Sequence, residues 1–83
     1  MSVEAKRNGN IVELDVREML EVNNDPFNVI MKAVETLKPD DKFVLHAIFK
    51  PMPLLRVLEG KGYSNQIEEL AENHWKITFT KGV

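Results

Sequence analysis

The chain has 83 residues, a hydrophobic fraction of 43% and a formal net charge of −2, which fits one small globular domain with one modest core. Acidic and basic residues are interspersed without a basic stripe, which argues against nucleic-acid binding, and the absence of cysteine excludes disulfides, cysteine-based zinc sites and thiol catalysis. No apolar run reaches the roughly 18 residues of a membrane span and the first ten residues are too polar for a signal peptide, so we expect a cytoplasmic protein without membrane contact.

Residues 1–9 are polar and are predicted to form a flexible N-terminal segment, so the single domain is placed at residues 10–83. Apolar and polar residues alternate from Ile11 to Val16, which predicts a first strand with one face toward the core. Residues 18–24 are predicted to be a loop. Three apolar side chains of this loop either tuck under the following helix or form an exposed rim: Met19, Leu20 and Val22.

The stretch from Asp25 to Leu37 has the apolar spacing of one helical face and is predicted to be the helix around which the core forms. The apolar side chains on that face are Phe27, Ile30, Met31, Val34 and Leu37. Asp25 is predicted to be the N-cap, because its carboxylate can accept a hydrogen bond from a first-turn N–H group. Pro26 is expected at the first helical position, where its missing N–H costs nothing.

The second half of the chain is predicted to contain three strands and one short helix. Residues 42–49 form a central strand, because both faces carry apolar side chains. A helix at residues 54–59 follows, and residues 63–70 are polar enough to predict an edge strand. Asn73, which tolerates positive φ, lies in a hairpin turn before the last strand at residues 75–81.

These elements predict an α+β fold: a two-layer βαβαββ sandwich with a four-stranded mixed sheet and two helices on one face. A helix between two strands implies parallel neighbouring strands joined by a right-handed crossover. The short turn before the last strand implies an antiparallel hairpin at the end of the chain.

Five short motifs carry a resemblance to a known family: Leu14-Asp15-Val16-Arg17, Asp25-Pro26-Phe27, Pro51-Met52-Pro53-Leu54, Gly62-Tyr63 and His74-Trp75-Lys76-Ile77. Over residues 11–81 the chain resembles an uncharacterised bacterial family of unknown function that is related to the TusA/SirA sulfur carriers. The resemblance implies the same two-layer fold. In the carriers a Cys-Pro pair opens the first helix and holds a persulfide, whereas the corresponding pair here is Asp25-Pro26. A carboxylate cannot carry sulfane sulfur, so the resemblance implies the scaffold without the persulfide relay.

Members of the resembled family also occur fused to other domains, including hemerythrin-like ones. This occurrence fits a module that binds or regulates a partner.

The carboxyl ends of the first two strands and the starts of both helices are expected to meet at one rim of the domain. The residues predicted to lie there are Arg17, Asp25, Lys50, Met52, Pro53 and Arg56. Helix N-termini and three cationic side chains favour an acidic ligand or a partner carboxylate at this rim. The alternative is structural: Asp25 is a helix cap, and Arg17 forms a surface ion pair with a neighbouring acidic residue.

The sheet face away from the helices is expected to be open and to carry an apolar strip that suits a homodimer or another protein partner. The residues of this predicted strip are Ile11, Val44, His46 and Ile48. His46 is interpreted as a packed or interface residue, and His74 is expected to be solvated in a turn. Two distant histidines without cysteine do not give the ligand spacing of a metal site, so no metal, cofactor or catalytic residue is predicted.

The sequence therefore predicts a non-enzymatic protein-binding or regulatory module, which contacts its partner through the open sheet face or through the rim. The alternative is a small-ligand or anion-binding domain that uses the helix N-termini. An enzyme with Asp25 or His46 as a general base lacks a second catalytic group in the sequence.

Overall fold

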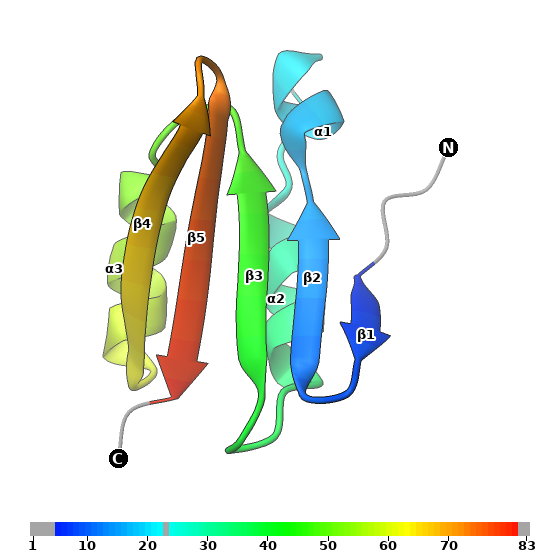
Figure 1. Cartoon of the computed structure of the whole chain (residues 1–83), viewed down its shortest axis with the longest axis vertical. Helices are drawn as coiled ribbons and strands as arrows, with labels where there is room; N and C mark the ends of the chain where they lie inside the picture. The colour runs from blue at the N-terminus through cyan, green and yellow to red at the C-terminus, as the bar shows by residue number, and fades with distance from the viewer. Residues whose placement is uncertain (1–4, 23, 82–83) are drawn as a thin grey trace.

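The computed structural model describes residues 5–22 and 24–81, and its described part forms a five-stranded mixed sheet with the strand order β1-β2-β3-β5-β4. Helices α2 and α3 lie on the same face of this sheet, and α1 lies beyond the end of β2 (Figure 1). The elements are β1 (Lys6–Asn8), β2 (Ile11–Asp15), α1 (Arg17–Glu21), α2 (Phe27–Glu35), β3 (Lys42–Ala47), α3 (Met52–Gly60), β4 (Tyr63–Ala71) and β5 (His74–Lys81).

The α+β class is confirmed, but the prediction of four strands is wrong. Lys6–Asn8 form the additional strand β1, which pairs antiparallel with β2, so these three residues belong to the sheet and not to a frayed segment. Residues 1–4 lie outside the described residues. All three residues of β1 are exposed, and this strand therefore lacks the alternation of apolar and polar residues from which strands are predicted.

The topology agrees with the predicted crossovers only in part. Strands β2 and β3 are parallel neighbours, as expected for strands joined through a helix, and β4 and β5 form the expected antiparallel hairpin. Strand β5, however, pairs antiparallel with β3 and lies between β3 and β4. The β3-α3-β4 connection therefore spans two strand positions, and β4 is an edge strand as predicted.

The region before α2 contains a short helix in place of the predicted loop. Arg17–Glu21 form α1, which places Met19 and Leu20 against the core, while Val22 after the helix remains 74% exposed. Of the two alternatives for these apolar side chains, inward packing therefore holds for Met19 and Leu20, and exposure holds for Val22.

Helix α2 begins at Phe27 with Pro26 as its N-cap, so the predictions of Asp25 as the N-cap and of Pro26 as the first helical residue are each one position too early. The N–H of Phe27 donates to Oδ1 of Asp25 at 2.9 Å, and Pro26 precedes the first helical residue. The buried residues of α2 are Ile30, Ala33 and Val34, whereas Phe27 is 42% exposed. Helix α2 is therefore amphipathic as predicted, but Phe27 at its start is partly exposed to solvent.

The core lies between the sheet and helices α2 and α3. Alternate residues of the central strands and the inner faces of both helices fill it, which is the packing expected when a sheet buries one face against helices. Its most deeply buried side chains are Val16, Leu14, Phe43, Leu45, Leu58, Ile77 and Phe79. The rings of Phe43 and Phe79 stack with centroids 5.8 Å apart and so join β3 to β5.

Candidate functional site

A groove of about 360 Å³ opens where β2 and β3 end and where α2 and α3 begin, and we call it the helix-end groove. Its lining is almost entirely apolar: Val16, Leu20, Pro26, Phe27, Ile30, Leu45, Ala47, Phe49, Pro51, Pro53 and Leu54. Asn24 and Asp25 supply the polar part of the lining. The groove lies at the carboxyl ends of two parallel strands, which is the usual place for ligands in α/β units.

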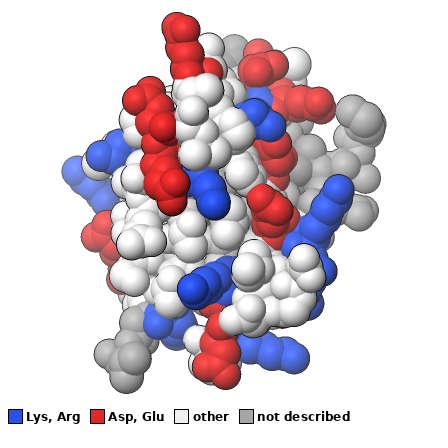
Figure 2. Space-filling view, in the orientation of Figure 1, with Lys and Arg blue, Asp and Glu red and all other residues white. Residues whose placement is uncertain are grey.

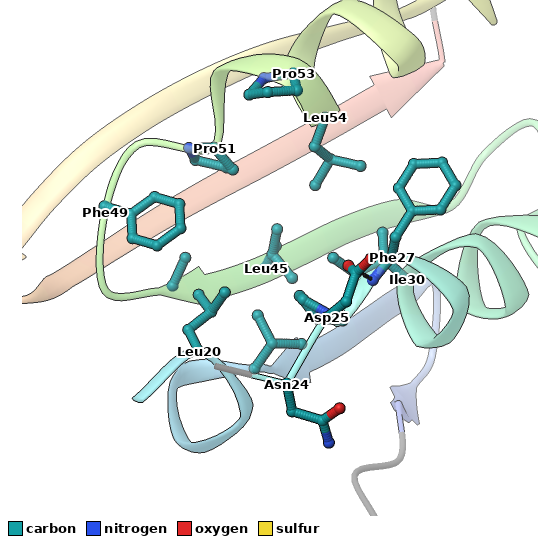
Figure 3. A pocket seen from close by; sticks show the side chains of 13 residues that line it. Leu20, Asn24, Asp25, Phe27, Ile30, Leu45, Phe49, Pro51, Pro53 and Leu54 are labelled. Atoms are coloured by element: carbon teal, nitrogen blue, oxygen red, sulfur yellow. Dashed lines mark hydrogen bonds between the residues drawn. The ribbon is translucent and has the colours of Figure 1, made fainter. Parts of the chain in front are cut away.

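Figure 3 shows how side chains from several segments of the chain form the walls of the helix-end groove. Phe49 and Pro51, from the connection between β3 and α3, lie on one side, and Phe27 of α2 lies on the other. Leu45 of β3 lies between them, and Leu20 of α1 closes a further side. Phe27 and Phe49 are 42% and 49% exposed, so the groove displays aromatic surface to solvent.

The structure divides the six predicted rim residues between different places. Asp25 and Pro53 line the helix-end groove, whereas the other four do not: Arg17, Lys50, Met52 and Arg56. Oδ1 of Asp25 accepts the N–H of Phe27, the first residue of α2, so this carboxylate binds a first-turn N–H group from the position before the N-cap Pro26. The three predicted cations therefore do not line the groove, whose walls are hydrophobic.

Arg17 forms a bidentate ion pair with Asp15. This pair is the surface ion pair that was predicted as the alternative to a role in anion binding. Nη2 of Arg17 lies 2.7 Å from Oδ2 of Asp15, and its Nε donates to Oδ1 at 3.0 Å. The hydrogen bonds from Arg17 lower the pKa of the Asp15 carboxyl, although partial burial acts in the opposite direction. Because Asp15 occupies its guanidinium, Arg17 is not a free anion receptor.

The predicted apolar strip on the open sheet face is broken in the structure. Ile11 is 41% exposed, but Val44 is only 8% exposed because it lies on a central strand between Glu13 and Thr78. Ile48 follows the end of β3 and is half-buried. Figure 2 views this face and shows charged side chains of both signs scattered over it. The four predicted residues therefore do not form a continuous exposed apolar surface.

The open face carries a hydrogen-bonded chain of three side chains, Glu13, His46 and His74, which we call the histidine chain. Nε2 of His46 lies 2.6 Å from Oε2 of Glu13, and Nδ1 of His46 lies 2.9 Å from Nε2 of His74. The expectation that His74 sits solvated in a turn is wrong, because it is the first residue of β5 and is half-buried. The two histidines are not distant from each other.

Burial lowers the pKa of the His74 ring, and the nearby groups of Arg17 and His46 lower it further, while Asp15 acts in the opposite direction. The neutral form of His74 therefore predominates at neutral pH. Within the described part of the chain, no three His, Cys, Asp or Glu side chains form a group that could hold a metal ion.

Comparison with known proteins identifies a family. The model of a family described as "uncharacterized conserved protein (DUF2249)" matches residues 13–81, which is most of the chain. The chain belongs to this family. No curated protein and no solved structure gives a match to the chain. Among the helices of residues 5–22 and 24–81, none has the length and apolar character needed to cross a membrane.

Two features of this family member do not follow from the sequence patterns. The predicted strand extends to Phe49, but β3 ends at Ala47 and Phe49 instead lines the groove. Pro51, two residues later, is the signal for the earlier end, because proline restricts the preceding backbone and cannot continue a ladder. The histidine chain requires the register between β3 and β5, in which Ala47 is opposite Trp75.

Proposed function

We propose that this chain is a non-enzymatic protein-binding module whose helix-end groove receives an apolar segment of a partner protein. The observation that carries the proposal is the groove itself, about 360 Å³ in volume, with two half-exposed phenylalanines among its lining residues. Concave apolar sites of about 300–1,000 Å³ with a few polar groups are the usual form of a binding pocket. The polar lining consists of Asn24 and Asp25, a pair that suits orientation of a ligand better than proton transfer.

The exposed aromatic rings would supply much of the binding energy of the proposed contact. Phe27 and Phe49 expose surface that a partner side chain would remove from water, at about 25 cal/mol for each Å² covered. Aromatic residues supply much of the energy of protein interfaces, because they bury large areas with little loss of side-chain entropy. An apolar anchor of the partner, such as a leucine or phenylalanine side chain, is the occupant that this lining favours.

Three prolines help to preorganise the groove. Pro26, Pro51 and Pro53 all line it, and each has a fixed φ angle and no backbone N–H group. A wall that is already ordered loses little conformational freedom on binding, so more of the contact energy remains as affinity. The same residues give the wall few hydrogen-bond donors, which again favours an apolar occupant.

The carboxylate of Asp25 favours a basic residue in the bound segment of the partner. Its Oδ1 atom accepts the N–H of Phe27, and no described residue forms a hydrogen bond or ion pair with its Oδ2 atom. A lysine or arginine beside the apolar anchor would place its cation against this oxygen. The proposed ligand is therefore an extended peptide segment with a large apolar residue next to a basic one.

The residues expected to bind an anion are either paired or outside the groove, which disfavours the anion-binding alternative. Arg17 is paired with Asp15, and the carboxylate of Asp25 already caps the first turn of α2. Lys50 and Arg56 are exposed side chains outside the groove lining. We therefore keep the protein-binding proposal alone.

Peptide selection tests this function while the partner is unidentified. A displayed random peptide library is selected on the folded domain, and enriched peptides are synthesised and measured by fluorescence anisotropy. We expect a large apolar residue beside lysine or arginine in the enriched sequences. Phe49→Asp should weaken their binding at least tenfold, because it puts a charge into the apolar wall beside the anchor.

Leu70→Asp is the matched control for Phe49→Asp. Both parent side chains are 49% exposed, but Leu70 lies on β4 and does not line the groove. Equal loss of binding in both variants, or no enriched peptide at all, would contradict the proposal. Circular dichroism of both variants shows that the comparison is made between folded proteins.

We also propose that the family is related to the TusA/SirA sulfur carriers. The support is the order of elements from β2 onward, in which α2 and α3 connect strands and a hairpin ends the domain. The sequence has no cysteine, so a persulfide relay does not accompany the proposed relation. A solved structure whose sheet has a different strand order from that of the carriers would contradict the relation.

A further inference from the structure

We propose that the helix-end groove binds the free N-terminus of a partner chain, with the α-ammonium group at Asp25 and a large apolar first side chain against Phe27 and Phe49. This preference rests on the function proposed above and specifies which part of the partner the groove receives. The groove combines apolar walls with one carboxylate oxygen that has no partner among the described residues. An N-terminal residue carries a cation and a side chain on the same Cα atom, so a single apolar residue at a chain terminus matches both features.

Asp25 holds its carboxylate at the edge of the apolar wall. Its Oδ1 atom accepts the N–H of Phe27 at 2.9 Å, which fixes the side chain beside the start of α2. Within residues 5–22 and 24–81, no hydrogen bond or ion pair uses its Oδ2 atom. The amide of Asn24 points away from Leu45 in Figure 3, so Asp25 is the charged acceptor that the groove offers. An ammonium group has only N–H donors and can donate to Oδ2.

A terminal ammonium group suits this position better than a lysine or arginine side chain. Asp25 is followed directly by Pro26 and Phe27, and all three residues line the groove, so the carboxylate and the aromatic wall are adjacent. In an N-terminal residue only the Cα atom separates the nitrogen from the Cβ atom of the apolar side chain. The cation of lysine lies at the end of a flexible four-carbon stem. Ordering that stem costs conformational entropy, which the short link of the terminus avoids.

The lining also favours the terminus of a peptide over a free amino acid. A free amino acid carries an α-carboxylate in addition to its ammonium group. Among the described residues, no lysine or arginine lines the groove, so this second carboxylate would lie near Asp25 without a cation. In a peptide the same carbon belongs to a neutral amide. Like charges in one site repel each other, so the peptide terminus is the occupant that the charges of the groove fit.

The walls of the groove set the identity of the first residue. Phe27 and Phe49 are 42% and 49% exposed and offer aromatic surface to a side chain that enters the groove. A leucine or phenylalanine at the terminus would cover this surface. An acidic first residue would place its charge among apolar walls and close to Asp25, so it should be rejected.

Two matched peptides test the preference for a free terminus. Both begin with phenylalanine, continue with glycine and serine and carry a fluorescent label at the C-terminal end, but one has a free amino group and the other is acetylated. We expect the free form to bind at least about tenfold more tightly by fluorescence anisotropy at pH 7, because acetylation removes the cation. Free phenylalanine should not displace it.

The pH dependence of binding distinguishes the α-ammonium group from a lysine. An α-amino group titrates near pH 7.7–8.0 and a lysine near 10.4, both approximate values for unperturbed groups. Asp25 is the one titratable side chain among the described lining residues. Raising the pH from 7 to 9 should therefore weaken the free form toward the affinity of the acetylated form and leave the acetylated form unchanged.

Asp25→Asn removes the charge while its side-chain carbonyl oxygen can still accept the N–H of Phe27. It should weaken the free form about tenfold and leave the acetylated form unchanged. Asp40→Asn is the matched control, because Asp40 is exposed and lies outside the groove lining. This control should bind both peptides as the parent does. An Asp25→Asn protein that binds the free form as tightly as the parent would overturn the proposal.

A third peptide separates the preference for a terminus from the proposed function of the groove. It is acetylated and carries phenylalanine beside lysine in its interior. If it binds while the free and acetylated terminal peptides bind equally, the groove receives internal segments and only the preference for a free N-terminus is overturned. If none of the three peptides binds, the proposed function of the groove fails as well.

Discussion

Nη2 of Arg7 lies 2.8 Å from Oδ2 of Asp41, and this ion pair ties the edge strand β1 to the turn between α2 and β3. Asp41 is 3% exposed, and it also accepts the backbone N–H of Lys38 at 2.8 Å. The same Arg7 nitrogen donates to the carbonyl oxygen of Thr36 at 3.2 Å. A buried carboxylate is costly unless it is paired and hydrogen-bonded, and both conditions are met here.

Arg7→Ala is predicted to destabilise the fold. The substitution leaves the buried Asp41 carboxylate without its cation, and breaking such a pair from one side is more costly than never having formed it. We expect the melting temperature to fall by at least about 5 °C, measured by circular dichroism at pH 7. Lys6→Ala is the control on the same strand, because Lys6 is exposed and forms no ion pair among the described residues. Equal melting temperatures of the two variants would show that the pair is not stabilising.

The stability of the fold should fall as the pH drops below about 6.5, in part because of His74. The folded state lowers the pKa of this ring from 6.5, so the unfolded chain binds the proton more readily. The corresponding stability is complete above pH 6.5 and is lost as the pH falls toward the folded pKa. Urea unfolding at pH 7.5 and at pH 5.5 measures the change.

His74→Gln should reduce the loss of stability between these two pH values. The carboxyls of Asp15 and Asp41 have pKa values lowered from 3.8, so they remain ionised over this interval and do not contribute to the difference. Their own contributions are lost only as the pH falls below about 3.8. If the variant loses as much stability as the parent between pH 7.5 and 5.5, protonation of His74 does not cause the loss.

Local patterns predict the parts of this fold in which apolar spacing and burial agree. The alternation in β2 places Val12 and Leu14 in the core, and both are buried. The helical spacing of α3 places three leucines inward, and all three are buried: Leu54, Leu55 and Leu58. In these elements the period of the strand or helix determines which side chains face the core.

The parts that local patterns miss depend on contacts between distant segments. Strand β1 has no apolar pattern, and the hydrogen bonds to β2 and the pair between Arg7 and Asp41 hold it in place. The histidine chain depends on the register that brings His46 near His74, which lie 28 positions apart in the sequence. Apolar spacing does not contain this information, because it reports burial and not which strands are neighbours.

The turn between β4 and β5 depends on Asn73, which has a φ of +61°. Asn73→Ala should lower the free energy of unfolding by about 1 kcal/mol, because a Cβ atom disfavours the left-handed region and alanine lacks the local hydrogen bonds of asparagine. Asn73→Gly should leave the stability nearly unchanged, because glycine adopts positive φ readily. Urea unfolding of the two variants measures the difference. Equal stability of both variants would mean that the turn tolerates alanine in another conformation.

Leu58→Ala should be among the most destabilising single substitutions in α3. The Leu58 side chain is 0% exposed and lies in the core, so its truncation removes buried apolar contacts and leaves a cavity. Such changes typically cost about 2–5 kcal/mol, a large share of the stability of a domain this small. Val57 precedes it on the same helix and is 37% exposed, so Val57→Ala should change the free energy of unfolding by no more than about 0.5 kcal/mol. Urea unfolding of both variants, with the slope of the transition compared with that of the parent, tests whether the inner face of α3 carries the stability. A Leu58→Ala protein as stable as Val57→Ala would mean that the core collapses around the lost side chain and that the packing of α3 is less constrained than its burial indicates.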